Sequence, residues 1–275
     1  MKKILLILLV LVISVAMIAC GEKSVSNSSQ NTDMPTITAE VTNIPTQKPE
    51  KLPIEESTKS PTEAPKEVPT TEPINVKSLE ELEELVEKDV EKTISELTKD
   101  FEELVNTIDT YESYKANIDT IEMFYEKIFI NTHALTNRLK IYTLYYAEII
   151  FSADNSIDDK YENMEEIYDV IYDNAGDDIY DEIYDGILDD MYDSFYDGIL
   201  DDAKNSVEYY EWSDLRSDEY DLWSDTRSDV YDDWSDTRSD IYDFWSDTRG
   251  ELWDEDIEKA IKEIERFKAD VAKQK

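Results

Sequence analysis

The residues best suited to binding a ligand are tryptophan, arginine and tyrosine, which recur in an eleven-residue unit near the C-terminus. Three copies begin at Trp212, Trp223 and Trp234, and a degenerate fourth begins at Trp245. The unit reads Trp-Ser-Asp-x-Arg-Ser-Asp-x-Tyr-Asp-x. Aromatic faces and guanidinium groups at fixed spacing are suited to binding through stacking and cation–π contacts.

Eleven residues make almost three turns of an α-helix, so the unit predicts one slowly twisting stripe with its tryptophans about 16 Å apart. Each Arg has a Trp four residues before it and a Tyr four residues after it, and we expect the guanidinium to lie against both rings. The candidate binding stripe comprises Trp212, Arg216, Tyr220, Trp223, Arg227, Tyr231, Trp234, Arg238, Tyr242, Trp245, Arg249 and Trp253. Two interpretations stay open: a surface for glycan rings, cell-wall polymer or a partner helix, or the buried side of a helix in a bundle.

The chain around this stripe is strongly acidic. The 275 residues include 67 Asp and Glu against 27 Lys and Arg, a formal net charge of −40, and residues 154–256 hold 37 acids and 6 bases. Such a chain is a poor partner for nucleic acid, whose binding needs concentrated Lys and Arg. Its acidic face can collect divalent cations or cationic peptides, or it can simply be a solvated surface that resists aggregation. No Asp-x-Asp-x-Asp-Gly loop is present, so we expect no specific metal site.

The sequence lacks the usual signals of an enzyme. It has no nucleophile elbow, phosphate-binding loop or cluster of metal ligands, and it contains one Cys and one His. Paired carboxylates occur throughout so acidic a chain and therefore carry little information. We expect no enzyme and no cofactor, and a hydrolase based on a carboxylate pair is the weakest hypothesis. The single histidine, His133, is expected on a helix surface or between helices.

The single cysteine follows an apolar N-terminal segment. Two lysines precede an unbroken apolar run over residues 4–13, and the segment Met17-Ile18-Ala19-Cys20-Gly21 resembles the lipobox of bacterial lipoproteins. In that family a diacylglyceryl group is attached to the Cys thiol and cleavage makes this Cys the first residue. The resemblance covers residues 1–21 and has Met17 where Leu is usual. The alternative is an ordinary signal peptide or an uncleaved anchor with an incidental cysteine.

The lipobox-like segment implies where the protein is located. A signal peptide over residues 1–19 and lipidation of Cys20 would anchor the chain to the membrane, on the extracytoplasmic face of a bacterial cell. Residues 20–76 contain all eight prolines, together with many Ser and Thr, and we expect a disordered linker that carries a domain away from the membrane.

The remainder of the chain predicts an all-α fold, an elongated bundle of long, coiled-coil-like helices. Over residues 77–153 apolar residues recur at three- and four-residue spacing, which is typical of amphipathic helices. Ser78 with Glu81, Asp109 with Glu112 and Ser156 with Asp159 are predicted helix caps, and residues 152–156 are the best turn signal. Whether the chain breaks near Asp109 stays open, because the apolar pattern continues across it.

A second repeat, of twelve residues, occupies residues 165–200 of an acidic, Tyr-rich region (154–206). Its two clearest copies read DDIYDEIYDGIL and DDMYDSFYDGIL. Apolar pairs recur every four residues, and on a helix with 3.6 residues per turn such a stripe drifts by about 40° per step. We therefore expect a strong right-handed supercoil, a break near Gly176, Gly186 or Gly198, or a helix surrounded by several neighbours. Residues 207–275 are expected to form the eleven-residue-repeat helix and a C-terminal helix.

These patterns favour a membrane-anchored extracytoplasmic lipoprotein that presents an acidic helical structural or protein-interaction module. The alternative is a ligand-capture surface, in which the aromatic stripe and the Asp-rich face take up cell-wall glycan, cationic peptide or divalent cations.

Overall fold

The computed structural model describes residues 76–273 of the chain. Every regular element in that range is a helix, and the long helices pack side by side as a bundle, which confirms the predicted all-α fold class. The predictions of a signal peptide over residues 1–19, of lipidation at Cys20 and of a linker over residues 20–76 fall, except for Val76, outside the described residues and remain predictions.

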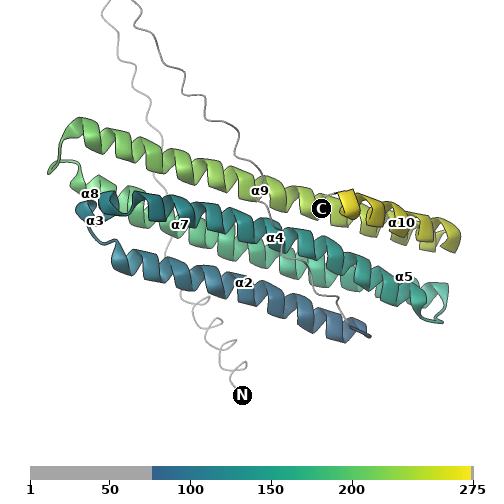
Figure 1. The fold of residues 1–275 in the computed structure, drawn as a ribbon. Coiled ribbons are helices and arrows are strands. Elements are labelled where there is room, and N and C mark those ends of the chain that lie inside the picture. The colour runs from purple at the N-terminus through teal and green to yellow at the C-terminus, as the bar shows by residue number, and fades with distance from the viewer. Residues whose placement is uncertain (1–75, 274–275) are drawn as a thin grey trace, which may run out of the picture. The chain divides into compact units, whose positions relative to one another are not determined.

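Four long helical runs alternate in direction along the described chain. Figure 1 shows α2 at one edge of the bundle and α9 at the opposite edge, with α4 and the third run between them. The first, second and fourth runs and the final helix are α2 (Leu79–Thr107), α4 (Ile118–Ser152), α9 (Tyr209–Trp253) and α10 (Ile257–Lys273).

Side-chain caps fix two helix starts where the sequence predicts them. Ser78 accepts a hydrogen bond from the Glu81 N–H at the start of α2, as the sequence predicts. Ser156 and Asp159 form the predicted reciprocal capping box at the start of α5 (Ile157–Asn163). Each cap supplies an acceptor to an N–H that the first helical turn leaves unpaired, and so sets where the helix begins.

The predicted cap at Asp109 and Glu112 is wrong, although the chain does break there. Thr110 adopts an extended conformation and forms a capping box with Ser113, which starts the short helix α3 (Tyr111–Ala116). The Ser113 hydroxyl also accepts a hydrogen bond from the Asp109 N–H. Two hydroxyl groups three residues apart thus replace the acidic cap, and the chain turns between α2 and α4.

The third run is a continuous helix in which π and α winding alternate, and we call it the α/π helix. Its segments are η1 (Ile167–Ala175), α6 (Gly176–Ile179), η2 (Tyr180–Ile187), α7 (Leu188–Met191), η3 (Tyr192–Leu200) and α8 (Asp201–Ala203). A π turn closes through an i→i+5 hydrogen bond and takes more residues than the 3.6 of an α turn. Alternating the two therefore averages near four residues per turn, and a twelve-residue unit makes about three turns.

This winding keeps the four-residue apolar period on one face. The buried stripe of the helix has a residue at every fourth position: Ile167, Ile171, Ala175, Ile179, Ile183, Ile187, Met191 and Phe195. The predicted break at Gly176, Gly186 or Gly198 is wrong, because the helix runs through all three. A strong supercoil is not needed, because the winding itself absorbs the drift. The expected neighbours are present, since α2, α4 and α9 all contact this helix.

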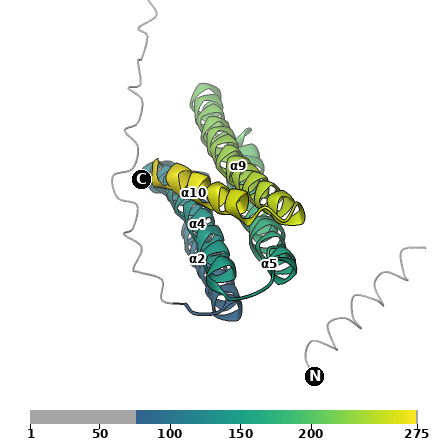
Figure 2. The ribbon, with the colours of Figure 1, turned by 90° about the vertical axis from the view of Figure 1, so that its right-hand side faces the viewer.

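The final helix closes one end of the core. Figure 2 shows α10 lying across α9 and extending toward α4, and α10 contacts both helices. Phe267 of α10 stacks on Phe244 of α9 with ring centroids 4.5 Å apart, and Ile264 and Val271 are buried on the same face. Burial of this apolar face holds α10 against the bundle.

Candidate binding surface

The eleven-residue array of α9 pairs in register with the twelve-residue array of the α/π helix. Ring centroids lie 4.6–4.8 Å apart in the pairs Trp223–Tyr192, Trp234–Tyr180 and Trp245–Tyr168. The contacts step by eleven residues on one helix and by twelve on the other. The two units therefore have the same axial length, which is about 16 Å for eleven α-helical residues.

Each arginine of the candidate stripe lies between two aromatic rings. The guanidinium carbon is 5.0–5.6 Å from the ring of the tryptophan four residues before it and 4.0–4.3 Å from a tyrosine of the facing chain segment. The tyrosine partners occur in the pairs Arg216–Tyr196, Arg227–Tyr184, Arg238–Tyr172 and Arg249–Tyr161.

The predicted contact of each arginine with its preceding tryptophan is thus confirmed, and the predicted contact with the tyrosine four residues ahead is wrong. Side chains of an α-helix lean toward the N-terminus of the helix, which carries the guanidinium back to the tryptophan and away from the following tyrosine. A tyrosine of the facing segment takes the second place, and the sequence of α9 alone could not have identified it.

Carboxylates complete these arginine sites. Each guanidinium pairs with an acid of the facing segment, in the pairs Arg216–Asp201, Arg227–Asp189, Arg238–Asp177 and Arg249–Glu165. Arg227 and Arg238 each pair with a second acid four residues earlier, Asp185 and Asp173. These acids also recur every twelve residues. Every arginine of the array is therefore neutralised within the bundle and stacked there, so the cationic groups of the stripe hold two segments together.

Burial divides the stripe into an inner and an outer part. Trp212 is buried, and its indole N–H donates to the Leu200 carbonyl at 2.6 Å. Trp223, Trp234, Trp245 and the four arginines are half-buried. The ninth residue of each unit remains outside: Tyr220, Tyr231, Tyr242 and Trp253 are 44, 42, 42 and 73 % exposed. We call these four residues the outer aromatic row.

A buried carboxylate interrupts the inner face of α9. Glu219 occupies the unit position that holds Val230 and Ile241 in the next two copies, and it is completely buried. Tyr114 and Tyr125 each donate a hydrogen bond of 2.7 Å to its carboxylate oxygens. Burial raises the pKa of Glu219, and the two hydrogen bonds oppose that increase in pKa.

A second polar group of α9 meets the only histidine. Asp233 accepts a hydrogen bond from Nδ1 of His133 at 2.9 Å and another from the Thr136 hydroxyl. His133 therefore lies between helices, which is one of the two positions predicted for it. The hydrogen bond to Asp233 raises the pKa of His133, and burial partly offsets it. Nearby, the buried Lys140 pairs with Asp240 at 2.8 Å. The sequence could have identified Glu219 and Asp233 as unusual, because each replaces an apolar residue that other copies of the unit have at its position.

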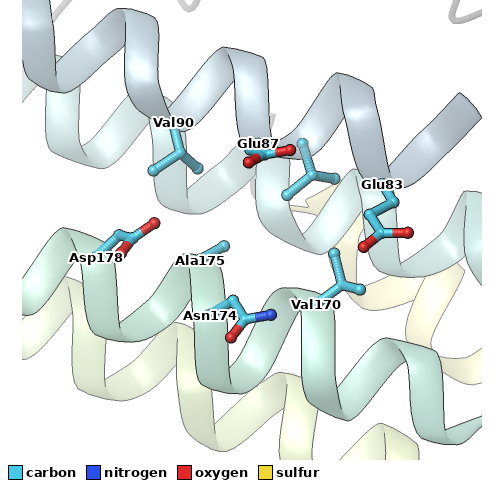
Figure 3. Close-up of a pocket in the computed structure, with 8 residues that line it drawn as sticks. Glu83, Glu87, Val90, Val170, Asn174, Ala175 and Asp178 are labelled. Atoms are coloured by element: carbon cyan, nitrogen blue, oxygen red, sulfur yellow. The ribbon is translucent and has the colours of Figure 1, made fainter. Parts of the chain in front are cut away.

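The pocket drawn in Figure 3 lies between α2 and the α/π helix. Glu83 and Glu87 line it on one side and Asn174 and Asp178 on the other, and its volume is about 270 Å³. Partial burial raises the pKa of Asp178, and nearby carboxylates raise it further. All four polar residues are exposed to water, so the pocket extends the acidic surface of the bundle.

Within residues 76–273, no group of three or more His, Cys, Asp or Glu side chains is placed to hold a metal ion. None of the helices in that range is sufficiently long and apolar to span a bilayer. No family model matches the sequence, and comparison with curated proteins and with solved structures finds no similar chain.

Proposed function

We propose that this protein is a bacterial lipoprotein anchored through Cys20 on the extracytoplasmic face of the cell membrane. In this proposal, residues 20–76 are a spacer, and the helical bundle is a structural or protein-interaction module without enzymatic activity. The lipobox-like segment Met17-Ile18-Ala19-Cys20-Gly21 supports the anchor, and the composition of residues 20–76 supports the spacer.

One observation favours a structural or protein-interaction module: the side chains best suited to binding a ligand are used to hold the bundle together. The arginines and the inner tryptophans of α9 are stacked and ion-paired against the α/π helix and α5. This arrangement favours a rigid scaffold that displays its outer faces. A site that gathered a small ligand would instead leave such groups free around a cavity.

The anchor is tested by replacing Cys20 with Ser in the producing bacterium. We expect the native protein to be found in the membrane fraction, to incorporate labelled fatty acid and to be cleaved by protease added to intact cells. The variant should lose the fatty-acid label. A variant that keeps the label, or a native protein that is protected from protease in intact cells, contradicts the proposed location.

The interaction role is tested by photocrosslinking in intact cells. A photoreactive amino acid at Tyr231, on the outer aromatic row, should give a discrete protein adduct. The same group at Val230, the neighbouring fully buried residue, is the matched control and should give none. No protein adduct at Tyr231 or at further exposed positions around the bundle would contradict the protein-interaction role.

Ligand capture is the second candidate function, and the outer aromatic row is the observation that favours it. Exposed aromatic rings stack on sugars, and the surrounding carboxylates attract cations. Because Trp212 and its half-buried counterparts hold the bundle together, the informative variants replace Tyr220, Tyr231 and Tyr242 instead. If these variants bind purified cell wall as well as the native protein does, the glycan version fails.

A further inference from the structure

We propose that the outer aromatic row is the docking surface for a basic polypeptide, whose Lys and Arg side chains lie on the rings and pair with the adjoining carboxylates. This inference rests on the proposed protein-interaction function and assigns it a surface and a class of partner. It rests on three features of the row: its repetition, its incomplete burial and its charge.

The row is defined by one position of the repeat. Tyr220, Tyr231, Tyr242 and Trp253 are the ninth residues of four successive units, so they recur about every 16 Å along one side of α9. The fourth unit is degenerate, with Gly250 where the others have Ser, yet its ninth residue is still aromatic. An aromatic ring is thus present at this position in every copy, including the copy that differs most.

Packing within the bundle covers only part of each ring. Tyr220, Tyr231 and Tyr242 contact tyrosines of the α/π helix with ring centroids 5.6–5.9 Å apart, and more than two-fifths of each side chain stays exposed. The preceding residue of the unit provides the buried contact, as Val230 and Ile241 do. Exposed aromatic side chains are enriched at surfaces that bind another protein.

The charge around the row selects a cationic partner. An aspartate follows each ring directly in the sequence, at positions 221, 232, 243 and 254, and all four are exposed. The arginines of the array are already paired with carboxylates, so they do not offset this charge toward an incoming partner. A Lys or Arg side chain gains a cation–π contact with the ring and an ion pair with the aspartate at the same place.

The surface is hollowed at the end of the row. A cavity of about 320 Å³ adjoins Trp253, and its wall includes Tyr161 and the carboxylates of Asp158, Glu162 and Glu255. Tyr161 and Trp253 contact each other at 5.7 Å with their rings inclined by 50°. Arg249 already lies on the Tyr161 ring, so the exposed ring of Trp253 and the three carboxylates are the groups that suit one long cationic side chain. This end of the row would hold the anchoring residue of the partner.

The 16 Å period favours a helical polypeptide over other cations. A partner helix with basic residues every eleven positions has the same spacing and keeps them near one face, so it can meet successive rings of the row. Divalent ions and single amines carry no such spacing.

Calorimetric titration of the complete protein with defined peptides tests the proposal. The probe is a helical peptide with Arg at every eleventh position, and the control peptide has the same composition in a different order. We expect the spaced peptide to bind at least tenfold more tightly, with affinity that falls as salt is raised. Equal affinity of the two peptides, or no binding of either, overturns the proposal, because attraction by diffuse charge does not distinguish spacing.

Variants of the row locate the binding. Replacing Tyr220, Tyr231 and Tyr242 with Ser should weaken binding of the spaced peptide at least tenfold, and replacing them with Phe should preserve it, because Phe keeps the aromatic face. Tyr210→Ser is the matched control, since Tyr210 is 75 % exposed on α9 outside the array. Equal binding by the Ser and Phe variants, with circular dichroism showing both folded, overturns the assignment of the row. Failure here with a protein adduct at Tyr231 in cells would reject the basic partner and leave the proposed function standing.

Discussion

At the scale of single residues, the five tryptophans report where the stripe lies. All five are in residues 212–253, so the tryptophan fluorescence of the whole protein comes from the array alone. Trp212 is buried, three tryptophans are half-buried, and Trp253 is 73 % exposed. The bundle therefore contains one strongly exposed tryptophan and four that are protected to different degrees.

We expect acrylamide to quench one component of this emission readily and the remainder weakly. Replacing Trp253 with Phe should remove the readily quenched component and shift the remaining emission to shorter wavelength, because the surviving indoles are shielded from water. Trp212→Phe is the control and should remove emission from the protected component. Readily quenched emission that survives in the Trp253 variant would mean that α9 does not pack against the α/π helix.

The buried carboxylate of Glu219 makes stability depend on pH. Its pKa is raised in the folded protein, so the folded state binds a proton more tightly than the unfolded state does. The stabilisation is present below the unfolded pKa of the group, near 4.3, and is lost as pH rises through the higher folded pKa. Mild acid should therefore strengthen this part of the interface.

Replacing Glu219 with Gln should flatten that pH dependence. The amide keeps the size of the side chain and removes its charge, so the gain in free energy of unfolding between pH 7 and pH 5 should be smaller in the variant than in the native protein. Urea unfolding followed by circular dichroism measures it, with the exposed Glu258→Gln as the control. An unchanged pH profile in the Glu219 variant would show that this carboxylate does not titrate in a buried site.

At the scale of elements, the sequence predicted α9 more completely than the helix it faces. A period of eleven fits three α turns, so the stripe, its spacing and the arginine–tryptophan contact followed from α-helical geometry. The period of four in residues 165–200 did not fit an α-helix and was compatible with a supercoil, a break or several neighbours. The π winding that resolves it depends on contacts along the whole helix, because π turns are rare and local propensities describe α turns.

In the candidate site, too, contacts within one helix could be predicted from the sequence and contacts between helices could not. The arginine ion pairs and the inner polar contacts of Glu219 and Asp233 join residues up to about a hundred positions apart. Spacing within one helix does not identify such partners. The departures of these two residues from the repeat marked them as unusual, but the hydroxyl and imidazole groups that satisfy them lie on other helices.

Glycine in the α/π helix provides a test of the winding. A Cβ atom at Gly186 or Gly198 would lie 3.1 or 3.0 Å from the carbonyl oxygen five residues earlier, which is tighter than most Cβ contacts, so the backbone would have to shift by a few tenths of an ångström. Replacing both glycines with Ala should therefore gain less free energy of unfolding than the usual Gly→Ala change in a helix interior, which gains about 0.5–1 kcal/mol.

Gly250→Ala is the matched control for this test. Gly250 lies in the α-helical winding of α9, and an added Cβ atom would meet nothing within 4 Å. It should gain about 0.5–1 kcal/mol in free energy of unfolding by urea denaturation. Equal gains at all three positions would indicate ordinary α winding in residues 180–200.

At the scale of the whole molecule, self-repulsion opposes folding. Residues 154–256 hold 37 acids and 6 bases, and the described helices bring many of these carboxylates to the surfaces of one bundle. Like charges on neighbouring helical turns destabilise a helix, and counterions screen them within about 10 Å at 0.1 M salt. The ion pairs of the arginine array are weakened by the same screening, but they are far fewer than the unpaired acids.

We therefore expect salt to stabilise this protein. Raising NaCl from 10 to 500 mM should increase the midpoint of thermal unfolding, by about 2–4 °C for each kcal/mol of relieved repulsion. Helix content measured by circular dichroism should not fall, and millimolar Mg²⁺ should act at lower concentration than Na⁺. A midpoint that decreases with salt would mean that the arginine ion pairs outweigh the repulsion.

The equal length of the eleven- and twelve-residue units has a consequence for inheritance. Tandem repeats gain and lose copies when DNA polymerase slips, and here two arrays with different coding lengths, 33 and 36 nucleotides per unit, lie in adjacent stretches of one gene. A copy added to the α9 array alone would leave a Trp, an Arg and a Tyr with no facing unit and expose an apolar patch. Selection should therefore retain changes in copy number only when both arrays gain or lose a unit together.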